Sequence, residues 1–134
     1  MIDDDIDDQY FYKDIFLELS KDLEFECVSD FRSLCERYFS DDLGDIDIPG
    51  LIILDLNLPK VSGKDIYKEL KKNTRLKCVP VVVLTTSDSP MDMQDCKDMG
   101  VTSYFVKPIE YERCKILSET ILNFYFEFNA LNKL

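Results

Sequence analysis

The sequence predicts a single α/β domain, built as a doubly wound, five-stranded parallel sheet with helices on both faces. Two runs of consecutive aliphatic residues, Leu51–Leu54 and Val81–Leu84, are typical of strands that are buried on both faces of a sheet. Along the whole chain, segments with helical spacing alternate with segments that have strand patterns, which indicates parallel strands joined by right-handed crossovers. At 134 residues the chain is long enough for one self-sufficient core, so we expect one domain over residues 1–134.

The first half of the chain is expected to contain two helices and one regular strand. Apolar residues recur with helical spacing over Ile6–Leu19, where aspartates crowd the first turn and complement the helix dipole. Leu23–Ser29 alternates apolar with polar or small residues, which predicts a strand. Asp30–Phe39 returns to helical spacing, with Asp30 as a plausible N-cap. The stretch Ser40–Gly50 is then an acidic loop.

The second half is expected to alternate strand and helix three times. In order, we expect a strand at Leu51–Asp55, a turn and short helix in Val61–Asn73, a strand in Val79–Ser87, a helix in Met91–Gly100 stopped by Gly100, a strand in Thr102–Pro108 stopped by Pro108, and a helix from Tyr111 to about Ala130. The opening strand is harder to place, because only Met1 and Ile2 precede the aspartates. Either this strand is a stub or residues upstream of Met1 are missing.

Composition excludes several kinds of partner and chemistry. The chain has 16 basic and 27 acidic residues and a net charge of −11, so it would repel phosphate backbones and anionic lipids, and we expect neither nucleic acid nor membrane as a partner. Histidine is absent, which excludes Ser-His-Asp and Cys-His catalysis and removes the commonest nitrogen ligand of zinc. Any metal should therefore be a hard cation that is held by oxygen atoms.

The cysteines and the N-terminus indicate a cytoplasmic protein. The five cysteines are odd in number, scattered and never in a C-x-x-C pair, which fits reduced thiols better than a disulfide framework. No stretch approaches the roughly 20 apolar residues of a membrane span, and the N-terminus is acidic where a signal peptide would be basic. We therefore expect a cytoplasmic location.

Polar side chains follow the expected strands at their carboxyl ends. Asp3 and Asp4 follow the first strand and Asp55 the third, while Thr85 and Lys107 lie at the ends of the fourth and fifth. Because the carboxyl ends of parallel strands meet at one edge of the sheet, where ligands bind, we expect these groups to converge. Like charges at about 4 Å repel by about 4 kcal/mol at an effective dielectric near 20, so the carboxylates need positive charge beside them.

Lys107 supplies one positive charge, and a divalent cation with oxygen ligands supplies two. Mg²⁺ suits a site that offers few carboxylates, several waters and an incoming phosphate. This combination points to phosphoryl chemistry, in which an aspartate such as Asp55 acts as the nucleophile and forms an aspartyl phosphate.

Four motifs together resemble the receiver domain of two-component response regulators, the CheY-like fold, along nearly the whole chain. They are the acidic pair in IDDD, Asp55 in LIILDLNLP, Thr85 in VVVLTTS and Lys107 in YFVKP. Asp4 lies 51 residues before Asp55, Thr85 lies 30 after it and Lys107 a further 22, and these spacings resemble those of the family. The resemblance implies a flavodoxin-like sheet with strand order 2-1-3-4-5. The wording around Asp55 and Thr85 further resembles small stand-alone regulators that partner phytochrome-like sensor kinases.

The resemblance implies a role for each residue of the acidic pocket. Asp55 would accept a phosphoryl group from a histidine kinase or a phosphotransfer protein and would share in binding Mg²⁺. Asp4 would bind the metal directly, Asp3 largely through water, and Asn57 through its backbone carbonyl. The triple aspartate leaves a choice of register, because Asp4 with Asp5 could serve in place of Asp3 with Asp4. The first choice is favoured, because counting from Asp4 places Phe11, Tyr12, Ile15 and Phe16 where the first helix of the family packs inward.

The resemblance also implies how the signal leaves the site. Thr85 would hydrogen-bond the phosphoryl group and Lys107 would pair with it. Tyr104 matches the aromatic residue that turns inward when the neighbouring hydroxyl shifts toward the phosphoryl group, and such a change biases a two-state equilibrium. The surface of the fourth strand, fourth helix, fifth strand and fifth helix would then change and be read by a downstream protein or a phosphate relay.

The terminal helix carries more apolar residues than one buried face can hold. They are Ile116, Leu117, Ile121, Leu122, Phe124, Tyr125, Phe126 and Phe128. Some of these side chains must face outward, and exposed apolar surface usually marks an association site. We therefore expect a homodimer through this helix; the alternative is that its end folds back on its own domain.

The sequence thus predicts a single-domain response regulator without an output domain, and not a metabolic enzyme: its only catalysis would be its own phosphorylation and dephosphorylation. One alternative is a degenerate receiver that binds partners without being phosphorylated. A haloacid dehalogenase-like phosphatase is disfavoured, because that family needs a second aspartate where this chain has Asn57. A flavodoxin-like cofactor binder is disfavoured because no Gly- or Ser/Thr-rich phosphate loop follows the first strand.

Overall fold

The structure is a computed structural model, which describes residues 1–39 and 48–132. The expected acidic loop therefore lies largely outside the described residues, and only Ile48, Pro49 and Gly50 of it are seen. No helix in the described part of the chain is both long enough and apolar enough to cross a membrane. All five cysteines carry free thiols.

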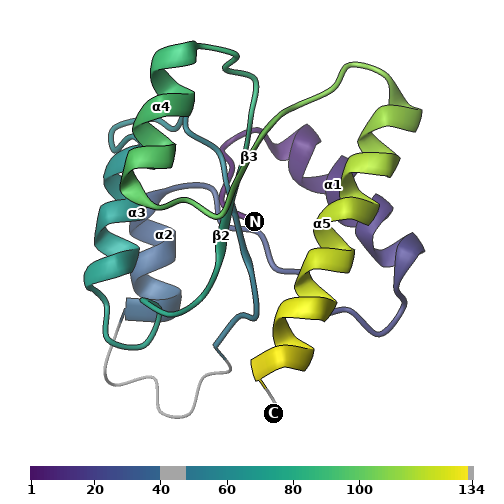
Figure 1. The fold of residues 1–134 in the computed structure, drawn as a ribbon, viewed down its shortest axis with the longest axis horizontal. Coiled ribbons are helices and arrows are strands. Elements are labelled where there is room, and N and C mark those ends of the chain that lie inside the picture. The colour runs from purple at the N-terminus through teal and green to yellow at the C-terminus, as the bar shows by residue number, and fades with distance from the viewer. Residues whose placement is uncertain (40–47, 133–134) are drawn as a thin grey trace.

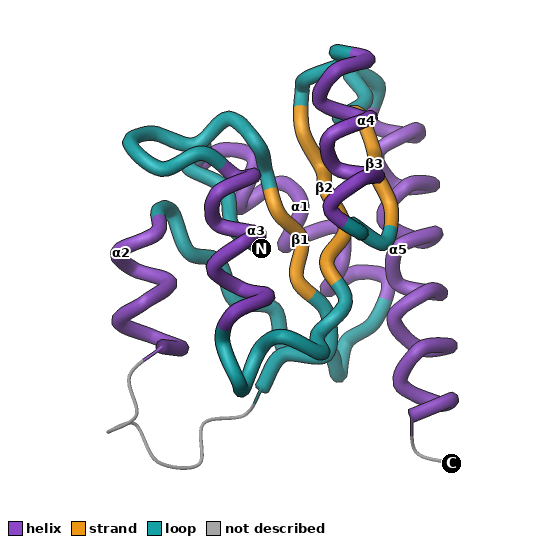
Figure 2. The backbone as a smooth tube through the Cα atoms, turned by 60° about the vertical axis from the view of Figure 1, so that its left-hand side comes forward, coloured by secondary structure: helices purple, strands orange, loops and turns teal. Residues whose placement is uncertain are grey.

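Helices cover both faces of a parallel sheet, as the alternating pattern predicts (Figure 1). Helices α1 (Ile6–Leu19) and α5 (Tyr111–Asn132) lie side by side on one face of the sheet. Helices α2 (Phe31–Leu34), α3 (Gly63–Lys72) and α4 (Pro90–Met99) lie on the other face. The three strands run side by side between the two helix layers, with α3 on one side of them and α5 on the other (Figure 2).

Three strands form the regular sheet of the described residues. They are β1 (Ile52–Leu54), β2 (Val81–Thr85) and β3 (Ser103–Val106), which pair in parallel in that order. Beyond β1, the sheet continues only as isolated parallel bridges, which join Ile2 to Leu54 on one side and to Val28 on the other. The five-stranded order 2-1-3-4-5 therefore stays a prediction.

The expected strand at Leu23–Ser29 is not a regular strand, because its neighbour is too short to pair with it. Met1 and Ile2 offer only one bridging position: the Val28 amide donates to the Met1 carbonyl at 2.9 Å, and the Asp3 amide donates to the Val28 carbonyl at 3.1 Å. The alternation seen in the sequence survives as burial, since Phe25 is partly buried while its neighbour Glu26 is exposed. The segment is thus extended, but it has a single bridge where a strand needs a ladder.

The core lies on both faces of the sheet, because successive residues of each buried strand point in opposite directions. In β1, Ile52 and Leu54 join a cluster with residues of α2 and α3, whereas Ile53 joins a cluster with α1 and α5. The predicted inward face of α1 is confirmed for Tyr12, Ile15 and Phe16, which are buried, while Phe11 is only partly buried.

The predicted helix boundaries hold with one difference. Asp30 caps α2 by accepting a hydrogen bond from the Ser33 amide, and Gly100 ends α4 in the left-handed conformation with φ of 90°. The helix that we expected over Asp30–Phe39 changes character after one turn, because Cys35–Phe39 forms a π-helix.

The terminal helix is only partly covered by its own domain. Ile121 and Leu122 are buried, but the side chains of Ile116 and Phe126 are 63% and 50% exposed. This confirms that one face cannot bury all of its apolar residues. Its last turns do contact the domain: Tyr125 packs so closely on Gly50 that a Cβ atom there would lie 2.4 Å from its ring.

Candidate functional site

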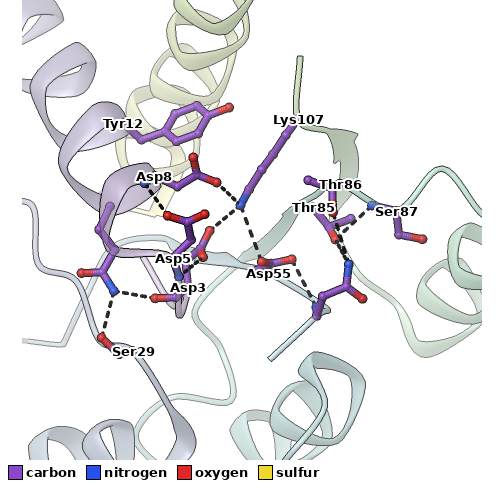
Figure 3. Close-up of polar contacts among 12 residues, drawn as sticks. Asp3, Asp5, Asp8, Tyr12, Ser29, Asp55, Thr85, Thr86, Ser87 and Lys107 are labelled. Carbon is purple, nitrogen blue, oxygen red and sulfur yellow. Dashed lines mark hydrogen bonds and ion pairs between the residues drawn. The ribbon is translucent and has the colours of Figure 1, made fainter. Parts of the chain in front are cut away.

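Backbone hydrogen bonds bring two distant carboxylates to the same edge of the sheet. The Asp55 amide, directly after β1, donates to the Ile2 carbonyl at 2.9 Å. The Ile2 amide in turn donates to the Ile53 carbonyl at 2.7 Å, so the N-terminal stub is fixed beside β1. Asp3 is the next residue after this pairing and therefore lies next to Asp55 at the carboxyl end of the sheet (Figure 3).

Asp3, Asp4 and Asp55 form a compact acidic group. Each offers a carboxylate oxygen, and these atoms all lie within 4.8 Å of one another. Asp3 and Asp55 are buried, whereas Asp4 is exposed. Asp5 lies outside this group, because its carboxylate caps α1 by accepting the Asp8 amide at 3.1 Å.

Lys107 reaches this group from the end of β3. Its Nζ atom lies 2.6 Å from Asp3 Oδ2, 2.7 Å from Asp8 Oδ2 and 3.6 Å from Asp55 Oδ2. Burial by itself would lower the pKa of Lys107, but the hydrogen bonds to Asp3 and Asp8 outweigh it and raise that pKa above its usual value. Burial raises the pKa of Asp3, and the hydrogen bond from Lys107 opposes this rise. Lys107 is therefore the charge that allows buried carboxylates to stand together.

A hydroxyl group lies on the other side of Asp55. Thr85, the last residue of β2, is fully buried, and its Oγ1 accepts hydrogen bonds from the Ser87 amide at 3.3 Å and from Asn57 Nδ2 at 3.5 Å. The backbone amide of Asn57 also donates to Asp55 Oδ1, at 3.2 Å. Because Thr85 acts only as an acceptor in these two bonds, its hydroxyl hydrogen remains available to a ligand at Asp55.

Tyr104 is tied to the loop that follows β2. Its hydroxyl donates to the Ser87 carbonyl at 2.8 Å, and the Ser87 hydroxyl donates to Asp92 at the start of α4. Burial raises the pKa of Tyr104. Thr85 and Tyr104 thus meet at the same residue, Ser87, one through its amide and the other through its carbonyl.

Two residues of the site were missed by sequence reasoning. Asp8 lies in the first turn of α1, shortly after the acidic pair, and this nearness to Asp3 and Asp4 was a signal that could have placed it beside them. Gly63 begins α3 against the end of β1, where a Cβ atom would lie 2.3 Å from the Asp55 carbonyl oxygen. Its signal was the Ser-Gly pair directly before a helical pattern, because close backbone approach requires glycine.

The acidic group fits a hard divalent cation. Mg²⁺ takes oxygen ligands and is usually held by one or two carboxylates together with water and phosphate oxygens. Asp3, Asp4 and Asp55 offer three carboxylate oxygens close together, and the exposed Asp4 leaves one side of the group open to water. The donor set contains no sulfur or imidazole, which agrees with the preference for a hard cation.

Comparison with known proteins gives a family match over most of the chain. The model of the response regulator receiver domain matches residues 1–117. Among curated proteins, the probable methanogenesis regulatory protein FilR2 of Methanothrix harundinacea is 38% identical over 86 residues, which are 64% of this chain and 56% of FilR2. The response regulator Rcp1 of Synechocystis is 39% identical over 79 residues, 59% of this chain and 54% of Rcp1. The matched part of the chain thus spans about half the length of these relatives.

Solved structures are similar over nearly the whole chain. The phosphorylated cyanobacterial phytochrome response regulator RcpA superposes with a TM-score of 0.83 at 27% identity, covering 93% of this chain and 90% of RcpA. The Mn²⁺-bound form of Rcp1 superposes with a TM-score of 0.79 at 29% identity, covering 92% of this chain and 90% of Rcp1. The likeness therefore extends beyond the sequence match to the whole arrangement of sheet and helices.

Proposed function

The chain belongs to the response regulator receiver family, and from this membership we propose that it is a phosphorylation switch in which Asp55 is the phosphoacceptor. One observation carries the proposal: at one edge of the sheet, Asp55 has two further carboxylates within 4.8 Å on one side and the Lys107 amine at 3.6 Å on another. Phosphoryl transfer to a carboxylate depends on positioning and on charge neutralisation, and this arrangement of carboxylates and amine would serve both.

In the transfer, a carboxylate oxygen of Asp55 attacks the phosphorus atom of a phosphorylated donor. The new bond joins phosphorus to the Asp55 oxygen, while the bond from phosphorus to the donor breaks and the donor leaves with its electron pair. Asp55 has only 6% of its surface exposed, so a donor would reach its carboxylate through that exposed part alone. Hydrolysis of the aspartyl phosphate by water returns Asp55 to its starting state.

Two groups of the chain, together with a bound metal ion, would stabilise the transferred phosphoryl group. Thr85 would donate its free hydroxyl hydrogen to one oxygen, and Lys107 would pair with another, since both lie on the same edge as Asp55. Asp3, Asp4, Asp55 and the Asn57 carbonyl would hold Mg²⁺. When bound, the metal supplies positive charge that neutralises the phosphoryl oxygens. The Mn²⁺-bound form of the relative Rcp1 supports a divalent cation in this fold.

We further propose that Ser87 couples the site to the surface. If the Thr85 hydroxyl moves toward the phosphoryl group, its hydrogen bond to the Ser87 amide is lost and the loop before α4 is freed. The bond between Tyr104 and the Ser87 carbonyl is then free to break, so that Tyr104 turns inward. This change would alter the surface formed by β2, α4, β3 and α5, which downstream proteins would read.

The proposed phosphate donor is a histidine kinase of the phytochrome-like class, or a phosphotransfer protein that acts between kinase and regulator. The support is the likeness to RcpA, a cyanobacterial phytochrome response regulator. We also propose a cytoplasmic location, where the five free thiols would stay reduced. Signalling would proceed by protein contact or by relay of the phosphoryl group, with no metabolic substrate.

The proposed homodimer rests on the exposed apolar residues near and along α5. Ile109 is fully exposed, Ile116 exposes more than half of its surface, and Phe126 exposes half. We expect light scattering to give twice the monomer mass in at least one phosphorylation state, and Ile116→Lys to reduce it. A monomer in both states would remove the homodimer from the proposal without touching the phosphoacceptor.

The phosphoacceptor is tested by mass. Incubation with acetyl phosphate and Mg²⁺ is expected to add one phosphoryl group to the native chain, none to Asp55→Asn, and one to the control Asp14→Asn. Asp14 is an exposed aspartate on α1, so its variant makes the same charge change far from the pocket. Failure of the native chain to gain mass with any donor would leave a degenerate receiver that binds partners without phosphorylation. Turnover of small phosphate esters would instead indicate a phosphatase.

A further inference from the structure

Lys107 makes one contact that the proposed chemistry does not account for. Its ammonium group has three hydrogens, and two of them are directed to carboxylates at 2.6 Å and 2.7 Å, those of Asp3 and Asp8 (Figure 3). The third carboxylate, that of Asp55, is 3.6 Å away, beyond an ordinary hydrogen bond. The amine is therefore held beside the phosphoacceptor by two other groups.

Asp8 is rigidly placed to hold the amine. It lies in the first turn of α1, and its amide donates a hydrogen bond to the Asp5 carboxylate that caps the helix, so the cap holds its backbone. Its side chain is 33% exposed, while that of Lys107 is only 7% exposed, so the contact lies where the acidic group meets solvent. Asp8 is not one of the three carboxylates that gather around the proposed metal position.

The two carboxylates that hold Lys107 differ in what else they must do. Asp3 would share its charge with Mg²⁺ in the proposed site, which weakens its hold on the amine. Asp8 has no such second task, so it is the partner that keeps Lys107 in place when the site is loaded. With one hydrogen bonded to Asp8 and another to Asp3, the third stays free for the phosphoryl group that Asp55, 3.6 Å away, would accept.

We propose that Asp8 is a positioning residue for phosphoryl transfer: it holds the Lys107 ammonium so that one N–H is directed at the phosphoryl group on Asp55. This inference rests on the proposed function. It adds no chemical step: phosphorus still exchanges its bond to the donor atom, an oxygen in acetyl phosphate or a nitrogen in a phosphohistidine, for a bond to the Asp55 oxygen, and acetate or the histidine leaves. Asp8 acts only through the orientation of Lys107.

Phosphorylation kinetics test the role of Asp8. With acetyl phosphate and Mg²⁺, the rate of mass gain is expected to fall on the order of tenfold in Asp8→Asn, because small misplacements of a stabilising group cost that much or more. The matched control is Asp7→Asn, which removes the same charge from the same helical turn. Asp7 is exposed and has no ion pair within the described residues, so its variant is expected to keep the native rate. Asp8→Glu, which restores a carboxylate, is expected to recover most of the rate.

A second measurement does not depend on phosphorylation. An ammonium group held by two carboxylates exchanges its hydrogens slowly, so Lys107 is expected to give a detectable NH₃⁺ signal in ¹⁵N NMR spectra of the native protein and of Asp7→Asn. This signal is expected to be lost to fast exchange in Asp8→Asn and to return in Asp8→Glu. A role of Asp8 in helix stability alone would not move it.

The outcomes separate this inference from the function on which it rests. If the native chain is not phosphorylated, the proposed function fails, while the NMR signal still reports whether Asp8 holds Lys107. If the native chain is phosphorylated and Asp8→Asn matches Asp7→Asn in rate, the positioning role is wrong. Asp8→Ser is the second variant should Asp8→Asn fail to fold, with the same results expected. Loss of the fold in both would show a structural role instead and would overturn the proposal.

Discussion

Gly63 shows how one backbone position sets the geometry of Asp55. A Cβ atom at this residue would lie 2.3 Å from the Asp55 carbonyl oxygen and 2.6 Å from the Leu56 Cα atom, both closer than real contacts allow. The Gly63 amide also donates to the Leu56 carbonyl at 3.0 Å, so the start of α3 is bonded to the turn after β1. Because the colliding atoms are backbone, they cannot move aside as a flexible side chain would.

Gly63→Ala is therefore expected to destabilise the protein by about 2 kcal/mol, since overpacking of this kind must shift the strand end. Urea unfolding followed by circular dichroism measures the change. Lys68→Ala, on the exposed face of the same helix, controls for the alanine itself and is expected to change stability by less than about 0.5 kcal/mol. Equal stability of the two variants would mean that α3 can move away from Asp55 without cost.

The sequence identified most residues of the site, but it did not show which carboxylates pair with the Lys107 amine. Asp3, Asp55, Thr85 and Lys107 were identified because strand ends converge, which follows from topology alone. Asp8 was missed because its role depends on where a long side chain ends, and a lysine just after β3 can reach several carboxylates. Which carboxylates the lysine binds depends on differences of a few ångströms, and the spacing of residues in the sequence does not reveal these.

At the scale of elements, Lys64 links α3 to α4. Its Nζ atom lies 2.6 Å from Asp92 Oδ1 and 2.8 Å from Asp95 Oδ2, and hydrogen bonds to these two groups raise the pKa of Lys64. Asp92 also accepts a hydrogen bond from the Ser87 hydroxyl, so the link reaches the loop after β2. The two helices and the loop are thus linked to one another in this structure.

Lys64→Gln is expected to lower the free energy of unfolding by at most about 1 kcal/mol, because the pairs are partly exposed to solvent. High salt should reduce the difference from the native protein by screening the charges. Lys68→Gln on the same helix is the control, since its pair with Asp65 is 4.0 Å long and well exposed, and we expect almost no effect. A larger loss for Lys68→Gln than for Lys64→Gln would contradict the link.

Secondary structure was predicted well where local sequence signals determine it, and poorly where it depends on hydrogen bonding to another segment. The helices α1, α4 and α5 follow from spacing, caps and Gly100, all of which are local. The segment Leu23–Ser29 has the alternation of a strand, yet it lacks a ladder because Met1 and Ile2 offer only one bridge. Whether Leu23–Ser29 forms a strand therefore depends on the length of the neighbouring N-terminal segment. The alternating pattern within Leu23–Ser29 contains no information about that length.

At the scale of the whole molecule, negative charges outnumber positive ones, and the excess extends to the edge of the sheet that holds the site. The chain carries a net charge of −11, and its buried edge holds Asp3 and Asp55 beside a single lysine that also binds Asp8. Carboxylates outnumber amines at that edge, so the folded state keeps an unfavourable interaction that a divalent cation would relieve. Ligands that bind only the folded state stabilise it by mass action.

Mg²⁺ is therefore expected to raise the melting temperature, with a stabilisation of about 2.7 kcal/mol once its concentration reaches 100 times its dissociation constant. Thermal unfolding at increasing Mg²⁺ measures the effect. Asp4→Asn should reduce the response, because Asp4 belongs to the acidic group near Asp55. Asp5→Asn should retain it, because asparagine caps a helix as well as aspartate does and Asp5 lies outside that group. Loss of the response in Asp5→Asn would instead place the metal on Asp4 with Asp5, and a melting temperature indifferent to Mg²⁺ in the native protein would exclude the site.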